Sequence, residues 1–422
     1  MVWQSINLHN TAHYFIIRPP ALTEEAGGLK ILNLMKRLFA IIALILVGSI
    51  YMTADELTDK SGEKIGFVYN VDFGMNFDNR EYYPSAFSSS MTIFGARLTP
   101  SIGLSLIQKD GTSHRIMAGV DVMKDFGASP ISEALAGGKT DETSSNLNNL
   151  ALFREITLYY HLEKRFGDTD MSLYAGVFPR RTMEGSYSQA FFSDSLKFYD
   201  NNLEGLLVKF RLPKARFEVG CDWMGQFGHA RRERFMIFSS GGGKVAPMLS
   251  FGYSGYLLHF ANSGQVGGVI DNILLNPYAR LDIGERTGLQ NLSFTLGYLQ
   301  ALQHNRKQVG YYVYPGGIHM DIEVRKWDVT IKNMTYYGTD LMPYYDSLDA
   351  GGNKYGTELY FGDPFYRVFD DSTTGAGLYD RLEICYEPSI GKHVRMRIAA
   401  IFHMHNFCYS GCQQVVGLTA SF

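Results

Sequence analysis

A two-residue alternation, apolar on one face and charged on the other, is the feature that most constrains this chain. Residues 394–406, VRMRIAAIFHMHN, place apolar side chains on one face and four basic side chains on the other: Arg395, Arg397, His403 and His405. A half-buried antiparallel strand alternates in this way with its polar face in water. A transmembrane β-strand does so with its apolar face in lipid and its polar face in a barrel lumen. A pattern that recurs along an exported chain would favour the transmembrane strand over the half-buried one.

The same alternation recurs along the chain, so it is a property of the whole fold. It is found at 65–77, 155–163, 216–223, 275–283, 318–325 and 379–387. Aromatic residues make up 14% of the chain, with 27 Tyr and 28 Phe. Tyrosine and phenylalanine favour strands and form the interfacial girdles of membrane barrels.

Short turns alternate with mostly longer connections. The short turns lie at 109–112, 166–170, 213–215, 239–244, 284–288, 325–328 and 388–392, and the long connections include 124–149, 179–202 and 338–376. A barrel with short periplasmic turns and long outer loops produces this alternation. We therefore expect an all-β, transmembrane, antiparallel up-and-down β-barrel of about sixteen strands, or about fourteen if 225–262 holds one strand and a loop.

The N-terminal region predicts export. Met35, Lys36 and Arg37 precede an apolar stretch that ends at Ile50, and small residues follow at Thr53 and Ala54. A basic start, a short apolar region and small residues are typical of a secretory signal peptide. We expect residues 1–34 to be a non-native N-terminal extension, 35–54 the signal peptide, and 55–422 a single barrel domain, since no Pro/Ser-rich linker divides it.

The last ten residues, QQVVGLTASF, provide a specific motif. Val416, Leu418, Ala420 and Phe422 share the apolar face of the last alternating segment. The chain resembles Gram-negative outer-membrane β-barrels of the porin-like family, whose last strand ends in phenylalanine. The resemblance implies residence in the cell outer membrane and assembly by the barrel-assembly machinery through the strand ending in Phe422. A soluble β-sandwich, the competing fold, does not explain this terminal phenylalanine.

Strand parity assigns charged side chains of both signs to the lumen, in near balance. The expected pore-lining residues are Asp72, Arg97, Asp121, Glu155, Glu218, Asp222, Arg280, Asp282, Asp321, Glu323, Arg325, Arg381, Glu383, Arg395, Arg397, His403 and His405. Rings of one sign select ions, so a balanced wall predicts weak charge selectivity. The alternative is that many of these charges pair across neighbouring strands and stiffen the wall.

Two long loops are candidates for a constriction that folds into the lumen. Loops of this length are usually functional or disordered. Their candidate residues are Arg180, Arg181, Glu184, Tyr360, Phe361, Asp363, Phe365, Tyr366 and Arg367. The aromatic and charged side chains of the second loop suit a sugar or an amphiphile, whereas a surface loop packed on its own aromatic residues is the alternative.

No catalytic residue, metal site or cofactor is expected. His403 and His405 share a face, but no third ligand or adjacent nucleophile is identifiable from spacing. Cys408 and Cys412 lie in FCYSGC, which we interpret as a tight loop with a disulfide or free thiols.

A passive channel is the function that these patterns favour. We expect a porin-like pore for small hydrophilic solutes, in contact with outer-membrane lipid. Assembly as a homo-oligomer is compatible with this function. The net charge of −3 and the lack of a basic stripe argue against a nucleic-acid partner. The alternatives are a non-conducting receptor, assembly or adhesion barrel whose lumen is plugged by 338–376, and, further away, a barrel hydrolase.

Overall fold

The computed structural model describes residues 57–58, 63–83, 87–126, 153–307, 309–368 and 375–422. The expected extension at 1–34 and signal peptide at 35–54 lie outside the described residues, and the domain boundaries stay predictions.

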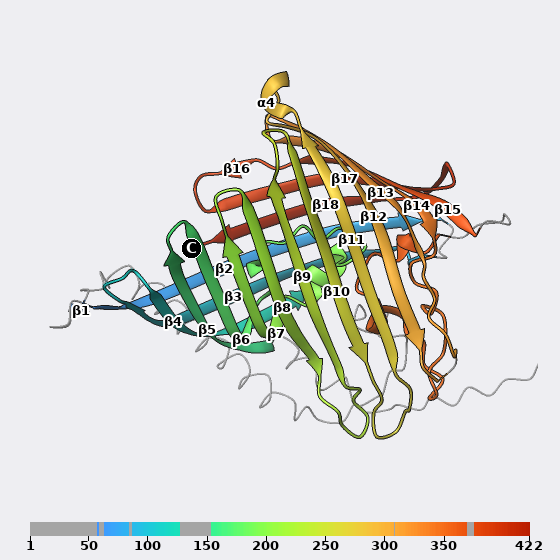
Figure 1. Ribbon diagram of the computed structural model, residues 1–422, viewed down its shortest axis with the longest axis horizontal. Coiled ribbons are helices and arrows are strands. Elements are labelled where there is room, and N and C mark those ends of the chain that lie inside the picture. The colour runs from blue at the N-terminus through green and yellow to red at the C-terminus, as the bar shows by residue number, and fades with distance from the viewer. Residues whose placement is uncertain (1–56, 59–62, 84–86, 127–152, 308, 369–374) are drawn as a thin grey trace, which may run out of the picture. The chain divides into compact units, whose positions relative to one another are not determined.

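The described residues form a closed antiparallel barrel of 16 strands, in which each strand pairs with its neighbours in sequence (Figure 1). The last strand, β18, closes the ring by pairing with β2, so that Gly411 lies opposite Tyr82 and Ser421 opposite Asp72. The strands are β2 (Lys64–Tyr82), β3 (Met91–Ile107), β4 (Ser113–Asp125), β5 (Phe153–Phe166), β6 (Thr169–Pro179), β7 (Asn202–Arg211), β8 (Ala215–Gly225), β9 (Arg234–Lys244), β10 (Leu249–Phe260), β11 (Ile270–Asp282), β12 (Asn291–Asn305), β13 (Gly316–Lys326), β14 (Val329–Thr339), β15 (Ala376–Tyr386), β17 (Val394–His405) and β18 (Cys408–Ser421). Two short strands, β1 (Leu57–Thr58) and β16 (Ser389–Ile390), pair with β2 and β17.

The all-β fold and the count of sixteen are thus confirmed, and 225–262 holds two strands, β9 and β10. The turn expected at 239–244 is wrong, because these residues belong to β9 and the turn follows at 245–248. The glycines at 241–243, which indicated a turn, are part of the barrel wall. A Cβ on Gly252 or Gly241 would collide with the rings of Tyr278 and Tyr253, so glycine makes room for aromatic side chains of neighbouring strands.

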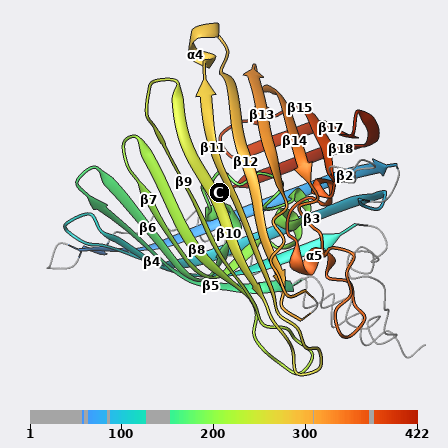
Figure 2. The same cartoon turned by 45° about the vertical axis from the view of Figure 1, so that its right-hand side comes forward.

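The two ends of the barrel differ in the length of their connections. One end carries short turns, such as Trp327–Asp328 between β13 and β14, and includes the one-turn helix α4 (Gly284–Thr287; Figure 2). The other end carries the long connections and the short Asn406–Phe407 turn between β17 and β18, and by the usual rule it faces the cell exterior. Helices are short, and none in the described part of the chain is long and apolar enough to cross a membrane.

The outer surface of the wall is apolar over the middle of the strands. Ile156 is 72% exposed and Ile318 is 52% exposed, and Ile398 on β17 is exposed as well. Solvent-facing positions in a soluble protein rarely carry so many large apolar side chains, whereas lipid-facing positions of a membrane barrel do. On β17 the opposite face is buried, with His403 at 0% and Ile401 at 1% exposure.

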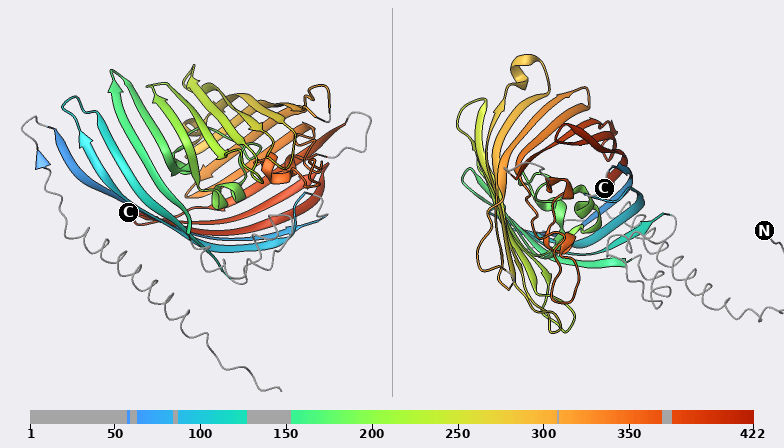
Figure 3. Two further views of the ribbon diagram at one scale, coloured as in Figure 1. Left: turned by 90° about the horizontal axis from the view of Figure 1, so that it is seen from below. Right: turned by 90° about the vertical axis from the view of Figure 1, so that its right-hand side faces the viewer.

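Two outer loops fold into the barrel and build a core there. The β6–β7 loop holds η2 (Arg180–Thr182) and α3 (Asp194–Tyr199), and the β14–β15 loop holds α5 (Gly356–Leu359) and η3 (Pro364–Tyr366). The right-hand view of Figure 3 shows these segments inside the ring of strands. Their aromatic side chains pack with wall residues in one cluster, whose fully buried members include Phe178, Phe191, Phe238, Tyr336, Phe365, Tyr366 and Tyr379. Each such ring buries roughly 150–250 Å².

Candidate functional site

The two inward loops are joined where they meet. Ser193 N–H donates to the Phe361 carbonyl at 2.9 Å, and Asp363 N–H donates to the Gln189 carbonyl at 2.8 Å. Gly362 lies at this crossing, where any Cβ would collide with the backbone of Ala190. The loops therefore act as one plug in the lumen, and their aromatic core lies in its outer half.

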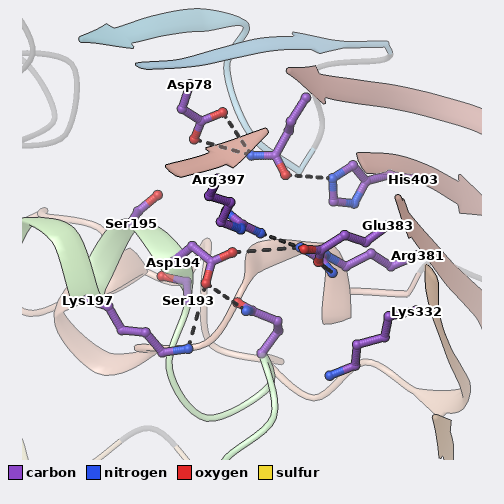
Figure 4. Close-up of polar contacts among 12 residues, drawn as sticks. Asp78, Ser193, Asp194, Ser195, Lys197, Lys332, Arg381, Glu383, Arg397 and His403 are labelled. Carbon is purple, nitrogen blue, oxygen red and sulfur yellow. Dashed lines mark hydrogen bonds and ion pairs between the residues drawn. The ribbon is translucent and has the colours of Figure 1, made fainter. Parts of the chain in front are cut away.

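A chain of polar contacts runs along the inner face of β2, β17 and β18 beside this plug (Figure 4). Gln413 donates to Asp78 at 3.3 Å, and its oxygen accepts from His403 Nε2 at 3.1 Å. His403 Nδ1 then accepts from the Tyr379 hydroxyl at 2.8 Å. Asp78 also forms an ion pair with Arg80 at 2.6 Å.

Helix α3 brings a second charged group to the same face. Arg80 Nη2 donates to the Ser195 hydroxyl at 2.6 Å, which ties the helix to β2. Asp194 lies 3.7 Å from both Lys197 and Arg381. Burial raises the pKa of the Asp194 carboxyl, but Lys197 and Arg381 outweigh this effect and hold the pKa at about 2.

Three wall side chains form one group of ion pairs beneath α3 (Figure 4). Glu383 bonds Arg381 and Arg397, each at 2.6 Å. Arg381 and Arg397, two of the expected pore-lining residues, therefore share one carboxylate. Arg395 lies two residues before Arg397, nearer the periplasmic end of β17, and is exposed.

A cavity of about 230 Å³ separates α3 from the wall. Its polar lining includes Asp78, Arg80, Asp194, Ser195, Lys197, Arg397 and Gln413. With three cationic and two anionic side chains, the lining carries a small positive excess and suits an anionic group. Among the residues described, no group of three or more His, Cys, Asp or Glu side chains is arranged to hold a metal ion.

A serine and a histidine meet at the outer end of the same face. His405 Nδ1 lies 3.0 Å from the Ser410 hydroxyl, and His405 Nε2 lies 2.9 Å from the Phe365 carbonyl of the plug. The rings of His405 and Phe87 stack with centroids 3.9 Å apart. His405 is 9% exposed and Ser410 is 3% exposed.

The periplasmic half of the lumen is open by comparison. A polar cavity of about 990 Å³ is lined there by residues of β7 to β14, including Arg280, Asp282, Asp321 and Glu323. Lys244, Ser250 and Arg280 lie side by side on neighbouring strands. The glycine-rich stretch 241–243 lies beside them, and the Tyr278 hydroxyl occupies space next to Gly242.

The other residues expected to line a pore are largely paired. Arg97 contacts Asp121 at 3.2 Å and both are buried, Glu155 accepts from Asn202 at 2.7 Å, and Asp72 pairs with Arg181. Asp222 pairs with Arg180 at 3.1 Å, and Glu218 accepts from the Glu184 backbone N–H at 2.7 Å. Arg325 is half-buried near the periplasmic end of β13. Their role in lining a pore stays a prediction.

The residues expected at a constriction lie in or beside the plug. Tyr360 donates to Gln303 at 2.7 Å, Asp363 accepts from the Phe365 N–H at 3.1 Å, and Glu184 bonds Lys209 and Arg211 at 2.6 Å. Arg367 pairs with Asp346 and lies over the Tyr345 ring. Phe361, Phe365 and Tyr366 belong to the buried core. Whether they set a pore diameter stays a prediction.

Sequence reasoning missed several members of this site. Asp78 and Arg80 continue the parity of Asp72 along β2, so extending the alternation beyond Phe77 would have found them. The tight loop assumed at Cys408 and Cys412 is wrong: the turn is Asn406–Phe407, and both cysteines lie on β18 as free thiols. That assumption concealed Ser410.

A family model described as lipid A 3'-O-deacylase-type matches residues 67–345, more than half of the 422-residue chain. The chain belongs to the lipid A 3'-O-deacylase-type family. The expectation that the protein is not an enzyme is therefore wrong, because this family is one of enzymes. The contact between His405 and Ser410 was not visible from spacing, because the two residues approach each other only across the β17–β18 hairpin. The protein is an outer-membrane β-barrel, as the resemblance implied.

The deacylase-type chain is also similar in structure to porins, at low identity. A loop-deletion mutant of OmpT, an outer membrane protein of Vibrio cholerae, is 9% identical with a TM-score of 0.49, and 85% of this chain and 99% of that one are covered. Pseudomonas aeruginosa OpdL is 11% identical with a TM-score of 0.47, covering 84% of this chain and 98% of that one. No curated protein matches the chain.

Proposed function

We propose that the protein is an outer-membrane hydrolase that removes an ester-linked acyl chain from a lipid A-type glycolipid. The observation that carries the proposal is the family match over 67–345, which includes most of β2, all of α3 and most of the barrel wall. Its reaction needs a site within reach of the outer leaflet, because that leaflet presents the glycolipid. The polar face beside the plug runs from Arg397, near the periplasmic start of β17, to Arg80, near the outer end of β2, so its outer part meets this requirement.

The charges of the site support an anionic headgroup. Arg80, Lys197 and Arg397 line the cavity of about 230 Å³ beside α3. Guanidinium and ammonium groups are the usual partners of phosphate in proteins. We infer that the phosphorylated sugar of the glycolipid is held here, with its acyl chains towards the membrane.

Mass spectrometry of the lipid tests the proposal. Purified protein in vesicles that contain lipid A should lower the mass of the lipid by one acyl chain and release the free fatty acid. Lys197→Ala should raise KM by about two- to fivefold, the value of one exposed ionic contact. Lys164→Ala is the matched control, since Lys164 also pairs with an aspartate, at 3.5 Å, but lies outside the cavity. An unchanged lipid mass with folded protein would reject the proposal.

Passive diffusion of small hydrophilic solutes is the second candidate function. The cavity of about 990 Å³ in the periplasmic half favours it, because this volume suits water and solutes. The aromatic plug in the outer half opposes it. The conductance of the protein in a planar bilayer distinguishes the two functions directly.

A further inference from the structure

We propose that the periplasmic cavity of about 990 Å³ binds a small organic molecule that carries two phosphate groups. This cavity is separate from the one beside α3, since no residue lines both. The inference therefore goes beyond the proposed deacylation, and beyond unselective diffusion through the lumen.

The plug bounds this cavity on its outer side. Ser186 of the β6–β7 loop lines the cavity, and its N–H donates to the Ser240 hydroxyl of β9 at 3.1 Å. The Arg216 guanidinium donates to the Ser186 hydroxyl, and the Ser254 hydroxyl of β10 donates to the Ser186 carbonyl. The short turn 245–248 lies at the opposite, periplasmic end. A solute therefore reaches this cavity from the periplasm.

Four cations gather on one wall of the cavity. Lys214 follows β7, Arg216 lies on β8, Lys244 ends β9 and Arg280 lies on β11. Within the part of the chain that the structure describes, none of the four forms an ion pair with a carboxylate. The Lys244 N–H donates to the Lys214 carbonyl at 2.8 Å, so these lysines are neighbours on adjacent strands. Like charges in such positions repel and destabilise a sheet, and a bound anion relieves this repulsion.

The backbone register places two of these cations in one row. Ser250 of β10 lies opposite both Lys244 and Arg280, so a hydroxyl separates the two cations. Neighbouring strands are about 4.8 Å apart, so the backbones of Lys244 and Arg280 are roughly 10 Å apart. Their long side chains can converge on one ligand from this distance.

The neighbouring row adds a guanidinium, a second hydroxyl and space. It contains Arg216, Gly242, Gly252 and Tyr278 in register on four adjacent strands. The Tyr278 ring lies across Gly252, with its hydroxyl next to Gly242, which lines the cavity. Guanidinium forks match the oxygens of phosphate, and hydroxyl groups donate further hydrogen bonds. A phosphate group can therefore approach the wall at Gly242, between Arg216 and the Tyr278 hydroxyl.

The carboxylates that line the cavity have other partners. Asp321 lies 4.0 Å from Lys332, and Glu184 bonds Arg211 at 2.6 Å. The remaining two, Glu323 and Asp282, accept hydrogen bonds at 2.5 Å and 3.1 Å. The charge that is left on the cationic wall thus favours an anion. A carboxylate neutralises one cation, whereas a phosphate group carries about −1.5 to −2 charges at neutral pH, so two phosphate groups match four cations.

Binding of pyrophosphate, a minimal molecule with two phosphate groups, tests the site. Titration calorimetry of the folded full chain in detergent, at low salt, should show saturable binding of one molecule per chain. Lys244→Gln and Arg280→Gln should each weaken binding by about tenfold or more, because each removes a charge-assisted contact. Arg395→Gln is the matched control and should bind as wild type. Arg395 also lies at the periplasmic end, with no ion pair among the described residues, but outside the cavity.

Thermal unfolding provides a second measurement on the same variants. Lys244→Gln should raise the temperature of the heat-modifiable transition in buffer without polyvalent anions, since it removes the repulsion with Lys214. Pyrophosphate should raise this temperature in the wild type and less in the variant. Folded wild-type protein that does not bind pyrophosphate overturns the inference, as does equal affinity in wild type, Lys244→Gln and Arg280→Gln. Citrate that binds as tightly as pyrophosphate would reject phosphate as the recognised group.

Discussion

At the residue scale, neighbouring side chains on β17 experience opposite environments. Ile398 is 42% exposed on the lipid face, whereas Arg397 on the lumen face bonds Glu383 at 2.6 Å. Ile398→Arg should reduce the folded, heat-modifiable fraction on gels, because a basic residue in the bilayer costs about 2–4 kcal/mol. Arg397→Ser should fold nearly as well as wild type, since Arg381 still pairs with Glu383. Equal loss of folded protein in both variants would contradict the register of β17.

At the element scale, an ion pair joins the inward β14–β15 loop to a neighbouring outer loop. Arg232, in the β8–β9 loop, contacts Asp349 of the β14–β15 loop at 2.6 Å, and both side chains are more than nine-tenths buried. Breaking a buried pair leaves one uncompensated charge and costs about 3–5 kcal/mol. Arg232→Gln should therefore make the β14–β15 loop susceptible to limited proteolysis. The control Lys354→Ala removes an exposed contact to Asp346 and should leave the cleavage rate unchanged.

The same ion pair predicts a dependence on acid. Burial raises the pKa of the Asp349 carboxyl, but the Asn353 N–H and Arg232 outweigh it, so the folded pKa is lowered. A lowered folded pKa stabilises the folded state above the unfolded value of about 4, and this contribution is lost as pH falls through the folded value. Protection of the loop should persist at pH 5 and decline below about pH 4, with an acid-stable protease as the probe. A loss of protection between pH 7 and pH 5 would assign the effect to another group.

At the scale of the whole molecule, the plug determines whether the barrel conducts. Because aromatic side chains of two loops fill the outer half of the lumen, the intact protein should conduct far less than an open 16-strand pore in a planar bilayer. Replacing 341–366 with a short Gly-Ser linker should raise the conductance, since this removes α5, η3 and their aromatic rings. Large conductance from the intact protein would favour the diffusion function instead.

The sequence alone determined the wall of this protein. The alternation of apolar and polar residues predicts which side chains face lipid. It can be read from a single strand of eleven or twelve residues, such as β15 or β17, because it does not depend on the rest of the fold. The strand count followed from the turns, and the outer-membrane location from the terminal strand with Phe422. The mistake at 239–244 arose because glycine indicates both a turn and a place where a neighbouring ring needs room, and only the neighbour Tyr253 distinguishes them.

Only the tertiary structure decided what fills the lumen inside the wall. A polar lumen position looks the same in sequence whether it faces water or a folded loop, so the parity of His405 could not reveal the Phe365 carbonyl that orients it. The contacts of Asp78 with Gln413, of Arg80 with Ser195 and of Arg232 with Asp349 join residues far apart in the chain. Closure of the barrel and inward folding of two loops create these contacts, and local periodicity contains no information about either event.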